Sequence, residues 1–176
     1  MAELRLVEAT TPEHFRTMSA IHARGWRKTY PGYVPDDYMR DVITDDHWVS
    51  IFAANRAAGH WQGLMLYRGD TPVACCTYGA GRNQGPEGPR YAGWGELWTF
   101  YTDPAHTGQG YGGLLMEAAL DRLRAAGYTQ CFVLVLRENE GARRFYARHG
   151  FHWDGTQVEI PFPPQVCIDL RYTQAL

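Results

Sequence analysis

The segment GQGYGG, residues 108–113, is the strongest candidate for ligand chemistry in this 176-residue chain. Glycines at this density allow successive backbone N–H groups to crowd together and point outward. The segment lies between an expected strand and an expected helix, so these N–H groups stand at the positive end of a helix dipole. The pattern therefore favours binding of a phosphate or pyrophosphate group. A glycine-rich turn without a ligand is the alternative interpretation.

Two familiar phosphate-binding patterns do not fit this spacing. A Walker loop requires lysine and then serine or threonine after its last glycine, and no lysine follows residue 113. A dinucleotide-binding fingerprint belongs to the first strand–helix unit of a domain and has an acidic residue at the end of the next strand. Here the loop follows the fourth expected strand, and the residue after the next strand is Arg137.

The four cysteines do not indicate a metal or redox site. No pair of them has the C-x-x-C spacing of a zinc or disulfide motif, and none is flanked by a nucleophile signature. Cys75 and Cys76 are adjacent in an expected strand, so their side chains should point to opposite faces. We therefore expect free, buried thiols and no metal.

The elements that would position the glycine loop follow from hydrophobic patterning. Alternating or continuous apolar residues predict strands at 4–9, 63–68, 72–79, 96–101, 131–136, 151–160 and 166–172. Capping and helical spacing predict helices from Pro12 to about Trp26, from Asp36, from Asp45, over 111–126 and over 139–149. Residues 80–95 are expected to form a loop. This order predicts the α/β class, with a mixed sheet and helices on both faces.

Length and composition restrict the function classes. A chain of 176 residues with 45% hydrophobic and 14% aromatic residues predicts one folded domain over residues 1–176, not a disordered chain. The formal charge of -2 disfavours a nucleic-acid-binding protein. No apolar stretch is long enough to span a membrane, and the N-terminus does not resemble a secretory signal. We expect a cytoplasmic protein.

Two separated segments together resemble one enzyme family. The run GELWTFYTDPAHTGQGYGGLLMEAAL and the later run VLRENEGARRFYARHGF are similar to the GCN5-related N-acetyltransferases (GNAT), in the same order and with an apolar strand between them. The resemblance covers residues 4 to 172, because IHARGWRKTYPGYVP is similar to the first-helix region of these enzymes. It implies a mixed, mostly antiparallel central sheet of about seven strands, splayed between strands 4 and 5 and flanked by helices. Acetyl-CoA would bind in the splay.

The resemblance also implies which residues meet the cofactor. Main-chain groups of Phe100, Tyr101 and Thr102 would pair with the pantetheine arm of acetyl-CoA. Backbone amides of the loop would hold its pyrophosphate, and the loop positions are Thr107, Gly108, Gln109, Gly110, Tyr111 and Gly112. Asn139 would contact the cofactor and also cap its helix. The family usually has arginine or glutamine at the position of Thr107, so one charge-assisted phosphate contact is missing here.

Two side chains match the catalytic positions of the family. Tyr146 corresponds to the tyrosine that faces the CoA sulfur, and a phenol that titrates near pH 10 keeps its proton to donate. The alternative is a helix tyrosine that packs in the core. Glu96 matches the glutamate that often deprotonates the amine through water, and its alternative is a solvent-exposed residue at a strand end.

Recognition of the acceptor is less clearly encoded. By resemblance, Trp26, Tyr30 and Tyr33 border the acceptor cleft, where aromatic faces could hold an alkyl or cationic amine. Asp36, Asp37, Asp41, Asp45 and Asp46 could attract cations, although helix capping explains most of them equally well.

The sequence thus predicts an N-acetyltransferase that moves acetyl directly from acetyl-CoA to a primary amine of a small molecule. A protein or peptide acetyltransferase and a degenerate acyl-CoA-binding protein are the alternatives. A homodimer is a further expectation from the resemblance, since family members are often dimers.

Overall fold

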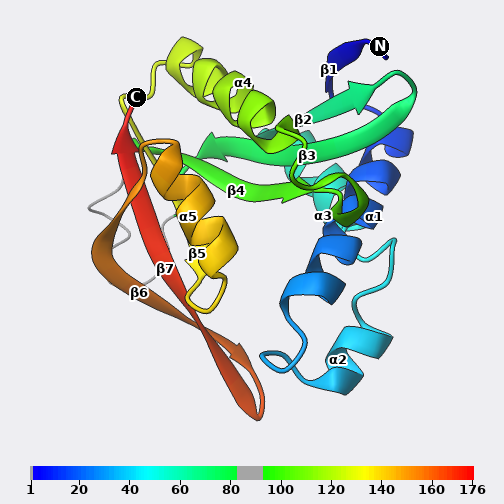
Figure 1. The fold of residues 1–176 in the computed structure, drawn as a ribbon, viewed down its shortest axis with the longest axis vertical. Coiled ribbons are helices and arrows are strands. Elements are labelled where there is room, and N and C mark those ends of the chain that lie inside the picture. Colours follow the sequence, from blue (N-terminus) through cyan, green and yellow to red (C-terminus); the bar gives the residue numbers. More distant parts are fainter. Residues whose placement is uncertain (1, 83–92) are drawn as a thin grey trace.

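The computed structural model describes residues 2–82 and 93–176, and within them the chain forms one seven-stranded sheet in the order β1-β2-β3-β4-β5-β7-β6 (Figure 1). β4 and β5 run parallel, and the other neighbouring pairs are antiparallel. The predicted α/β class and mostly antiparallel sheet are confirmed. The strands are β1 (Leu4–Glu8), β2 (Trp61–Arg68), β3 (Thr71–Ala80), β4 (Gly95–Thr102), β5 (Gln130–Leu136), β6 (His152–Phe162) and β7 (Gln165–Ala175).

The first helix begins where the capping pattern predicts it. α1 (Pro12–Thr29) has Thr11 as its N-cap, and the Thr11 hydroxyl accepts the N–H of His14 at 3.2 Å. The His14 ring accepts the Thr11 N–H in return, which completes a capping box. Two short helices follow, α2 (Asp36–Asp41) and α3 (Val49–Ala57).

The third helix starts later than the sequence predicted. Residues 45–48 form a turn, and α3 begins at Val49, not at Asp45. The Asp45 carboxylate instead pairs with Arg27 of α1 at 2.8 Å, so it is not an N-cap. The later helices, α4 (Tyr111–Ala125) and α5 (Glu140–Arg148), lie within the predicted ranges, as Gly127 and Gly150 at positive φ follow their ends.

Helices cover both faces of the sheet, and the strands alternate between two cores (Figure 1). Leu115 and Leu123 of α4 pack on one face, in the same cluster as Cys76. Phe15 and Met18 of α1 pack on the other face, in the same cluster as Cys75. Adjacent cysteines on opposite faces follow from the two-residue period of a strand, and all four thiols are free.

The β6–β7 hairpin extends beyond the rest of the sheet toward α2 (Figure 1). Near its tip, the Phe162 ring lies edge-on to Tyr38 of α2 at 5.2 Å and to Trp26 of α1 at 6.0 Å. The Cys167 thiol of β7 donates to the Tyr33 carbonyl at 3.3 Å. These contacts join the C-terminal hairpin to the N-terminal helices across the sheet. The predicted 80–95 loop falls mostly outside the described residues.

Candidate active site

β4 and β5 separate soon after they begin. Their ladder joins Gly95 to Cys131, Glu96 to Phe132 and Leu97 to Val133, and it stops there. The last four residues of β4, 99–102, still pair with β3 on the other side. Their main chain is therefore open toward β5, and the strands diverge from this point (Figure 1). This is the splay implied by the sequence, and main-chain groups of Phe100, Tyr101 and Thr102 lie along it.

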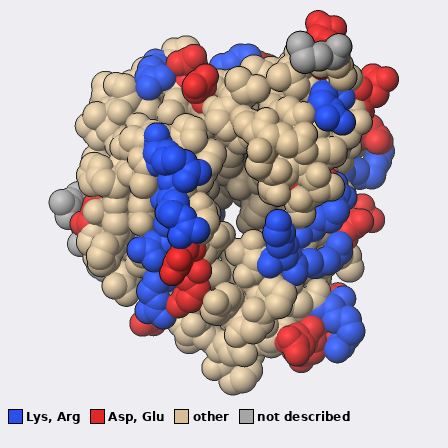
Figure 2. Space-filling view, viewed as in Figure 1, with Lys and Arg blue, Asp and Glu red and all other residues tan. Residues whose placement is uncertain are grey.

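A cavity of about 630 Å³ opens at this splay. Most of the predicted cofactor-binding residues line it, namely Phe100, Tyr101, Thr102, Thr107, Gly108, Gly110, Tyr111, Gly112 and Asn139. Gln109 lies in the same turn but is exposed and does not line the cavity. Figure 2 shows a hollow at the middle of this face with Lys and Arg gathered on both sides of it. Lys28 of α1 and Arg148 of α5 contribute cations to the lining.

The glycine loop leaves helix N–H groups free at the cavity. Gly108 and Gly110 have φ of +77° and +84°, a left-handed conformation that glycine adopts at little cost. Gly110 is the N-cap of α4 and has no side chain to accept the first N–H groups of the helix. The Thr107 hydroxyl donates to the Pro104 carbonyl at 3.2 Å and stabilises the preceding turn, η2 (Pro104–His106). The loop therefore offers backbone donors to an anion.

Tyr146 lies at the same cavity, at the inner end of α5. The residue is buried, and no hydrogen bond joins its hydroxyl to another of the described residues. Burial raises the pKa of the Tyr146 phenol, and the neighbouring Tyr101 and Asp169 raise it further. The hydroxyl therefore keeps its proton at physiological pH and can donate it. At the other end of α5, the Asn139 side chain caps the helix by accepting the Ala142 N–H at 3.1 Å.

A second cavity of about 260 Å³ adjoins the first, and Tyr101 lines both. Of the predicted acceptor residues, Trp26 and Tyr30 line it, whereas Tyr33 is exposed in a separate groove beside β7. Sequence reasoning missed several of its residues, which are His22, Trp48, Arg82, Trp98, Leu134, Ile160 and Asp169. A signal existed for Asp169, since a single carboxylate interrupts the apolar run VCIDL.

Asp169 and His22 are among the titratable groups of this second cavity whose pKa values are displaced. Burial raises the pKa of Asp169 to about 6, with Glu138 adding to the rise and Arg82 opposing it. Burial, helped by His47, lowers the pKa of His22 to about 3. His22 is therefore neutral at physiological pH, and its ring stacks on Trp48 at 3.8 Å. Asp169 is a carboxylate that exchanges its proton near neutrality.

The structure places Glu96 in a buried ion pair. Only 1% of the residue is exposed, and the Arg82 guanidinium donates to its carboxylate at 2.6 Å while the Arg82 backbone N–H donates at 2.8 Å. Glu96 also lies where β4 still pairs with β5, before the splay, and it does not line the second cavity. A role for Glu96 as base stays a prediction, and it would require the Arg82 pair to open.

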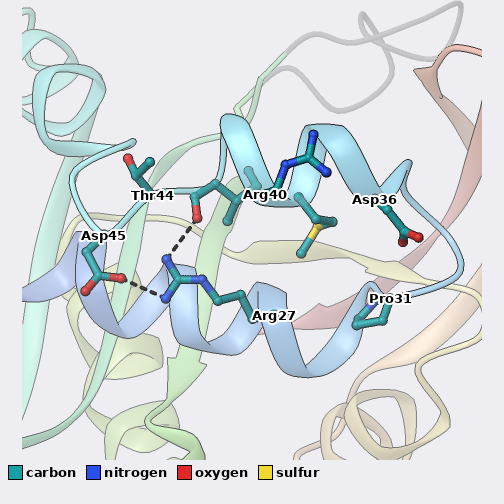
Figure 3. A pocket seen from close by; sticks show the side chains of 8 residues that line it. Arg27, Pro31, Asp36, Arg40, Thr44 and Asp45 are labelled. Carbon is teal, nitrogen blue, oxygen red and sulfur yellow. Dashed lines mark hydrogen bonds and ion pairs between the residues drawn. The ribbon is translucent and has the colours of Figure 1, made fainter.

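Of the acidic residues 36–46, Asp36 and Asp45 line a different hollow. It lies between α1 and α2, and Figure 3 shows Arg27 reaching across it to Asp45 and to a backbone carbonyl. That carbonyl belongs to Ile43 and accepts at 2.9 Å. Arg40 pairs with its neighbour Asp41 at 2.7 Å. Local pairing thus accounts for Asp41 and Asp45, and neither carboxylate lines the splay.

The part of the chain that the structure describes contains neither a cluster of metal ligands nor a membrane-spanning helix. No three side chains of the His, Cys, Asp and Glu types come together there as a metal site would require. No helix there has the length and apolar character needed to cross a membrane.

Comparison with known proteins now defines the class. The sequence model of the acetyltransferase (GNAT) family matches residues 20–151, and this chain therefore belongs to that family and is an acyltransferase. Its members use acetyl-CoA as the donor, which agrees with the cavity at the splay. Comparison with curated proteins gives no match.

Solved structures show the same fold at low sequence identity. The PaiA N-acetyltransferase from Thermoplasma acidophilum, in complex with coenzyme A, is 16% identical with a TM-score of 0.73 over 99% of both chains. An N-acetyltransferase from Staphylococcus aureus Mu50 is 17% identical, with a TM-score of 0.74 over 99% of both chains. YncA from Salmonella typhimurium, with its cofactor acetyl-CoA, is 16% identical, with a TM-score of 0.71 over 98% of this chain and 94% of that chain.

Proposed function

We propose that this chain is a single-domain enzyme that transfers the acetyl group of acetyl-CoA directly to the primary amine of a small molecule. The observation that carries the proposal is the shared wall at Tyr101. On one side lies the large cavity with the glycine loop, and on the other a smaller, aromatic cavity. A donor in the first and an amine in the second would meet at the splay, where binding both at once favours reaction.

The residues of the larger cavity suit a CoA thioester. Backbone N–H groups at the start of α4 would bind the pyrophosphate, and Lys28 and Arg148 add positive charge to the same lining. The open main chain of β4 would pair with the amides of the pantetheine arm. The Tyr146 hydroxyl would protonate the departing CoA thiolate.

Direct transfer needs no covalent enzyme intermediate. Cys167 is the cysteine that lines the acceptor cavity, and burial raises its pKa, with Asp169 and Glu138 adding to the rise. Its thiol donates to the Tyr33 carbonyl. A thiol held in this state is a poor nucleophile, because the thiolate is the reactive form. The amine is therefore the group that attacks the thioester.

The volume of the acceptor cavity favours a small molecule over a peptide. The cavity measures about 260 Å³, and α1, Trp48 just before α3 and the tip of the β6–β7 hairpin contribute to its walls. A protein acetyltransferase needs an open groove that admits an extended chain. The homodimer, the cytoplasmic location and the absence of a nucleic-acid partner stay predictions.

The first experiment measures binding of acetyl-CoA by its effect on the melting temperature, because a ligand of the folded state stabilises it by mass action. We expect Gly110→Val to abolish the shift, since a Cβ at the N-cap of α4 would project where phosphate approaches. Gly127→Val is the matched control. Both glycines have a positive φ, +84° and +89°, and a Cβ at either meets nothing within 4 Å. Both variants carry the same backbone strain.

The two variants separate the interpretations. Loss of the acetyl-CoA shift in Gly110→Val alone supports the phosphate site, and an equal shift in both variants contradicts it. An amine panel with detection of free CoA then tests transfer. A strong shift with no release of CoA in the presence of any amine would identify a binding protein without turnover.

A further inference from the structure

We propose that Asp169 binds the ammonium group of the acceptor and takes its proton, and that the aromatic walls around it select amines with an apolar or aromatic body. This inference rests on the proposed function and names the substrate class and the proton acceptor of the same site. It assigns to Asp169 the role that the sequence suggested for Glu96.

Asp169 differs from the other carboxylates that lie inside the fold. Glu96 pairs with Arg82, Asp103 with Arg24, and Asp154 with Arg171. Asp169 is half-buried, yet its carboxylate has no hydrogen bond or ion pair with any of the described residues. A carboxylate removed from water without a partner is costly to ionise. A cation from outside the protein would remove that cost, so the cavity is suited to a cationic ligand.

The cavity walls provide the apolar part of the recognition. The rings of Trp26 and Tyr30 stack at 4.2 Å, and Phe162 closes one side with its ring 6.0 Å from that of Trp26. Aromatic faces attract an ammonium group and pack well against an apolar or aromatic body.

The charges in this cavity favour an ammonium group over an anion. His22 is neutral, because burial lowers its pKa to about 3. Arg82 is the cation of the lining, but its guanidinium is bound to Glu96 and lies over the Trp98 ring at 4.7 Å. Among the described residues that line the cavity, Asp169 therefore carries the charge that is free to bind a ligand.

Asp169 also lies close to the reacting end of the donor site. It pairs across strands with Leu136, the last residue of β5, on the side of the splay opposite β4. Burial raises the pKa values of Tyr101 and Tyr146, which line the cofactor cavity, and the charge of Asp169 adds to both rises. Asp169 lines the acceptor cavity and Tyr146 lines the adjoining donor cavity, so one can act as the proton acceptor and the other as the proton donor.

The ionisation of Asp169 responds to groups on every side. Burial and Glu138 raise its pKa to about 6, and Arg82 lowers it. The ionisable side chains that face it besides these two are those of Tyr30, Tyr101, Tyr146 and Cys167, all of which stay protonated at neutral pH. A carboxyl group with a pKa near 6 is a stronger base than an ordinary aspartate and is still ionised at pH 7 to 8.

The proposed step balances in protons and bonds. Asp169 accepts one proton from the ammonium group, and the nitrogen lone pair attacks the thioester carbonyl carbon. The carbon–sulfur bond breaks, and the Tyr146 hydroxyl gives its proton to the sulfur. The second proton on nitrogen passes to the Tyr146 oxygen, which restores the hydroxyl. The products are the amide and free CoA, and Asp169 releases its proton to solvent.

The experiment uses the full chain with acetyl-CoA and two probes, 2-phenylethylamine and L-phenylalanine, which differ by one carboxylate. We expect the wild type to prefer 2-phenylethylamine by at least about tenfold in kcat/KM, because Asp169 repels the carboxylate. For 2-phenylethylamine, kcat/KM should rise through pH 6 and then stay level, since ammonium and ionised Asp169 form the reactive pair. Each profile is measured from pH 5 to 9.5.

Asp169→Asn is the test variant, and Glu159→Gln is the matched control that removes an exposed carboxylate of the neighbouring strand β6, outside the cavity. We expect Asp169→Asn to lose about 100-fold in kcat/KM at pH 7 and to approach the wild type at high pH, where the amine is already neutral. The melting shift with acetyl-CoA should stay unchanged in this variant, because Asp169 does not line the cofactor cavity. Glu159→Gln should remain within about threefold of the wild type.

Several outcomes would overturn the inference. One is Asp169→Asn activity within threefold of the wild type at pH 7, and another is the same pH-dependent loss in Glu96→Gln instead. If Asp169→Asn does not fold, the wild-type profile decides. A plateau above pH 6 supports Asp169, and a steady tenfold rise per pH unit up to the pKa of the amine overturns it. If the wild type acetylates no small amine in the panel, the proposed function fails as well.

Discussion

At the scale of single residues, burial raises the pKa of both Tyr146 and Asp169, the two groups that we place at the reaction. The same shift suits them to opposite roles. Burial raises the pKa of the Tyr146 phenol, which keeps the proton that a general acid must supply. It also raises the pKa of the Asp169 carboxyl group, which makes the carboxylate a better proton acceptor. One apolar splay thus prepares both an acid and a base.

Replacing Tyr146 by phenylalanine tests the acid. The change deletes a hydroxyl that bonds to none of the described residues and leaves the ring packing against Phe100 and Phe151. We expect kcat to fall by about ten- to a hundredfold, with KM for acetyl-CoA nearly unchanged, because the hydroxyl acts mainly in the transition state. Steady-state kinetics at saturating amine measure both constants. Wild-type kcat in this variant would return Tyr146 to a purely structural role.

At the scale of elements, the sequence predicts what depends on local patterns. The Thr11 cap, the seven strands and the glycine-ended helices all follow from periodicity and capping within a few residues. The predicted start of α3 was wrong, because Asp45 pairs with Arg27, and no local pattern reports that contact. Where such a helix begins depends on contacts with residues that are distant in the sequence.

The two cavities also differ in how far local sequence patterns predict their residues. The donor cavity is built around one continuous loop and helix start, so its residues were predictable from two motifs. The acceptor cavity collects residues from α1, β4, β5 and the β6–β7 hairpin, and no spacing links them. Glu96 illustrates the limit, because its position in a strand was clear but its partner Arg82 was not. Asp169 was missed because strand register alone decides that it faces the splay.

The crossing of α1 over β4 provides a prediction at this scale. α1 passes so close to β4 that a Cβ on Gly25 would collide with the Tyr101 ring. We expect Gly25→Ala to lower the free energy of unfolding by about 1 to 3 kcal/mol, since a packed core yields little to an added methyl group. Activity toward amines should fall too, because Tyr101 lines both cavities. Urea denaturation measures the stability.

Gly141→Ala is the control for this experiment. A Cβ there meets only the Asn139 side chain, at 3.8 Å, within the described residues. Alanine in the first turn of α5 should leave stability unchanged or raise it slightly, because glycine is the weaker helix former. A Gly25→Ala protein as stable as this control would show that the two elements are not in close contact.

At the scale of the whole molecule, the splay divides the sheet into two parts that contacts elsewhere hold together. α1 and α2 pack against the tip of the β6–β7 hairpin through Trp26, Tyr38 and Phe162. The Cys167–Tyr33 hydrogen bond adds to this junction. These contacts close the acceptor cavity on the side away from the cofactor. The fold can therefore keep β4 and β5 apart over most of their length without separating its two halves.

Keeping an unpaired carboxylate in this splay should cost the folded chain stability, and the pH dependence gives the sign. The pKa of Asp169 is about 6 in the folded protein against an ordinary value of 3.8. The folded state therefore binds more protons than the unfolded state between these values, and stability falls as the pH rises from about 4 through 6. An asparagine side chain does not titrate, so we expect Asp169→Asn to match the wild type near pH 4 and to exceed it above pH 6.5.

The expected gain above pH 6.5 is on the order of 1 to 3 kcal/mol, since one unit of pKa corresponds to about 1.4 kcal/mol. Urea denaturation of both proteins from pH 4 to 8 measures it, and the difference between the two curves cancels every other titrating group. Equal stability at all pH values would mean that Asp169 is not desolvated in the folded state. A variant that loses activity while it gains stability would identify Asp169 as a residue kept for function, because a purely structural residue would lose both.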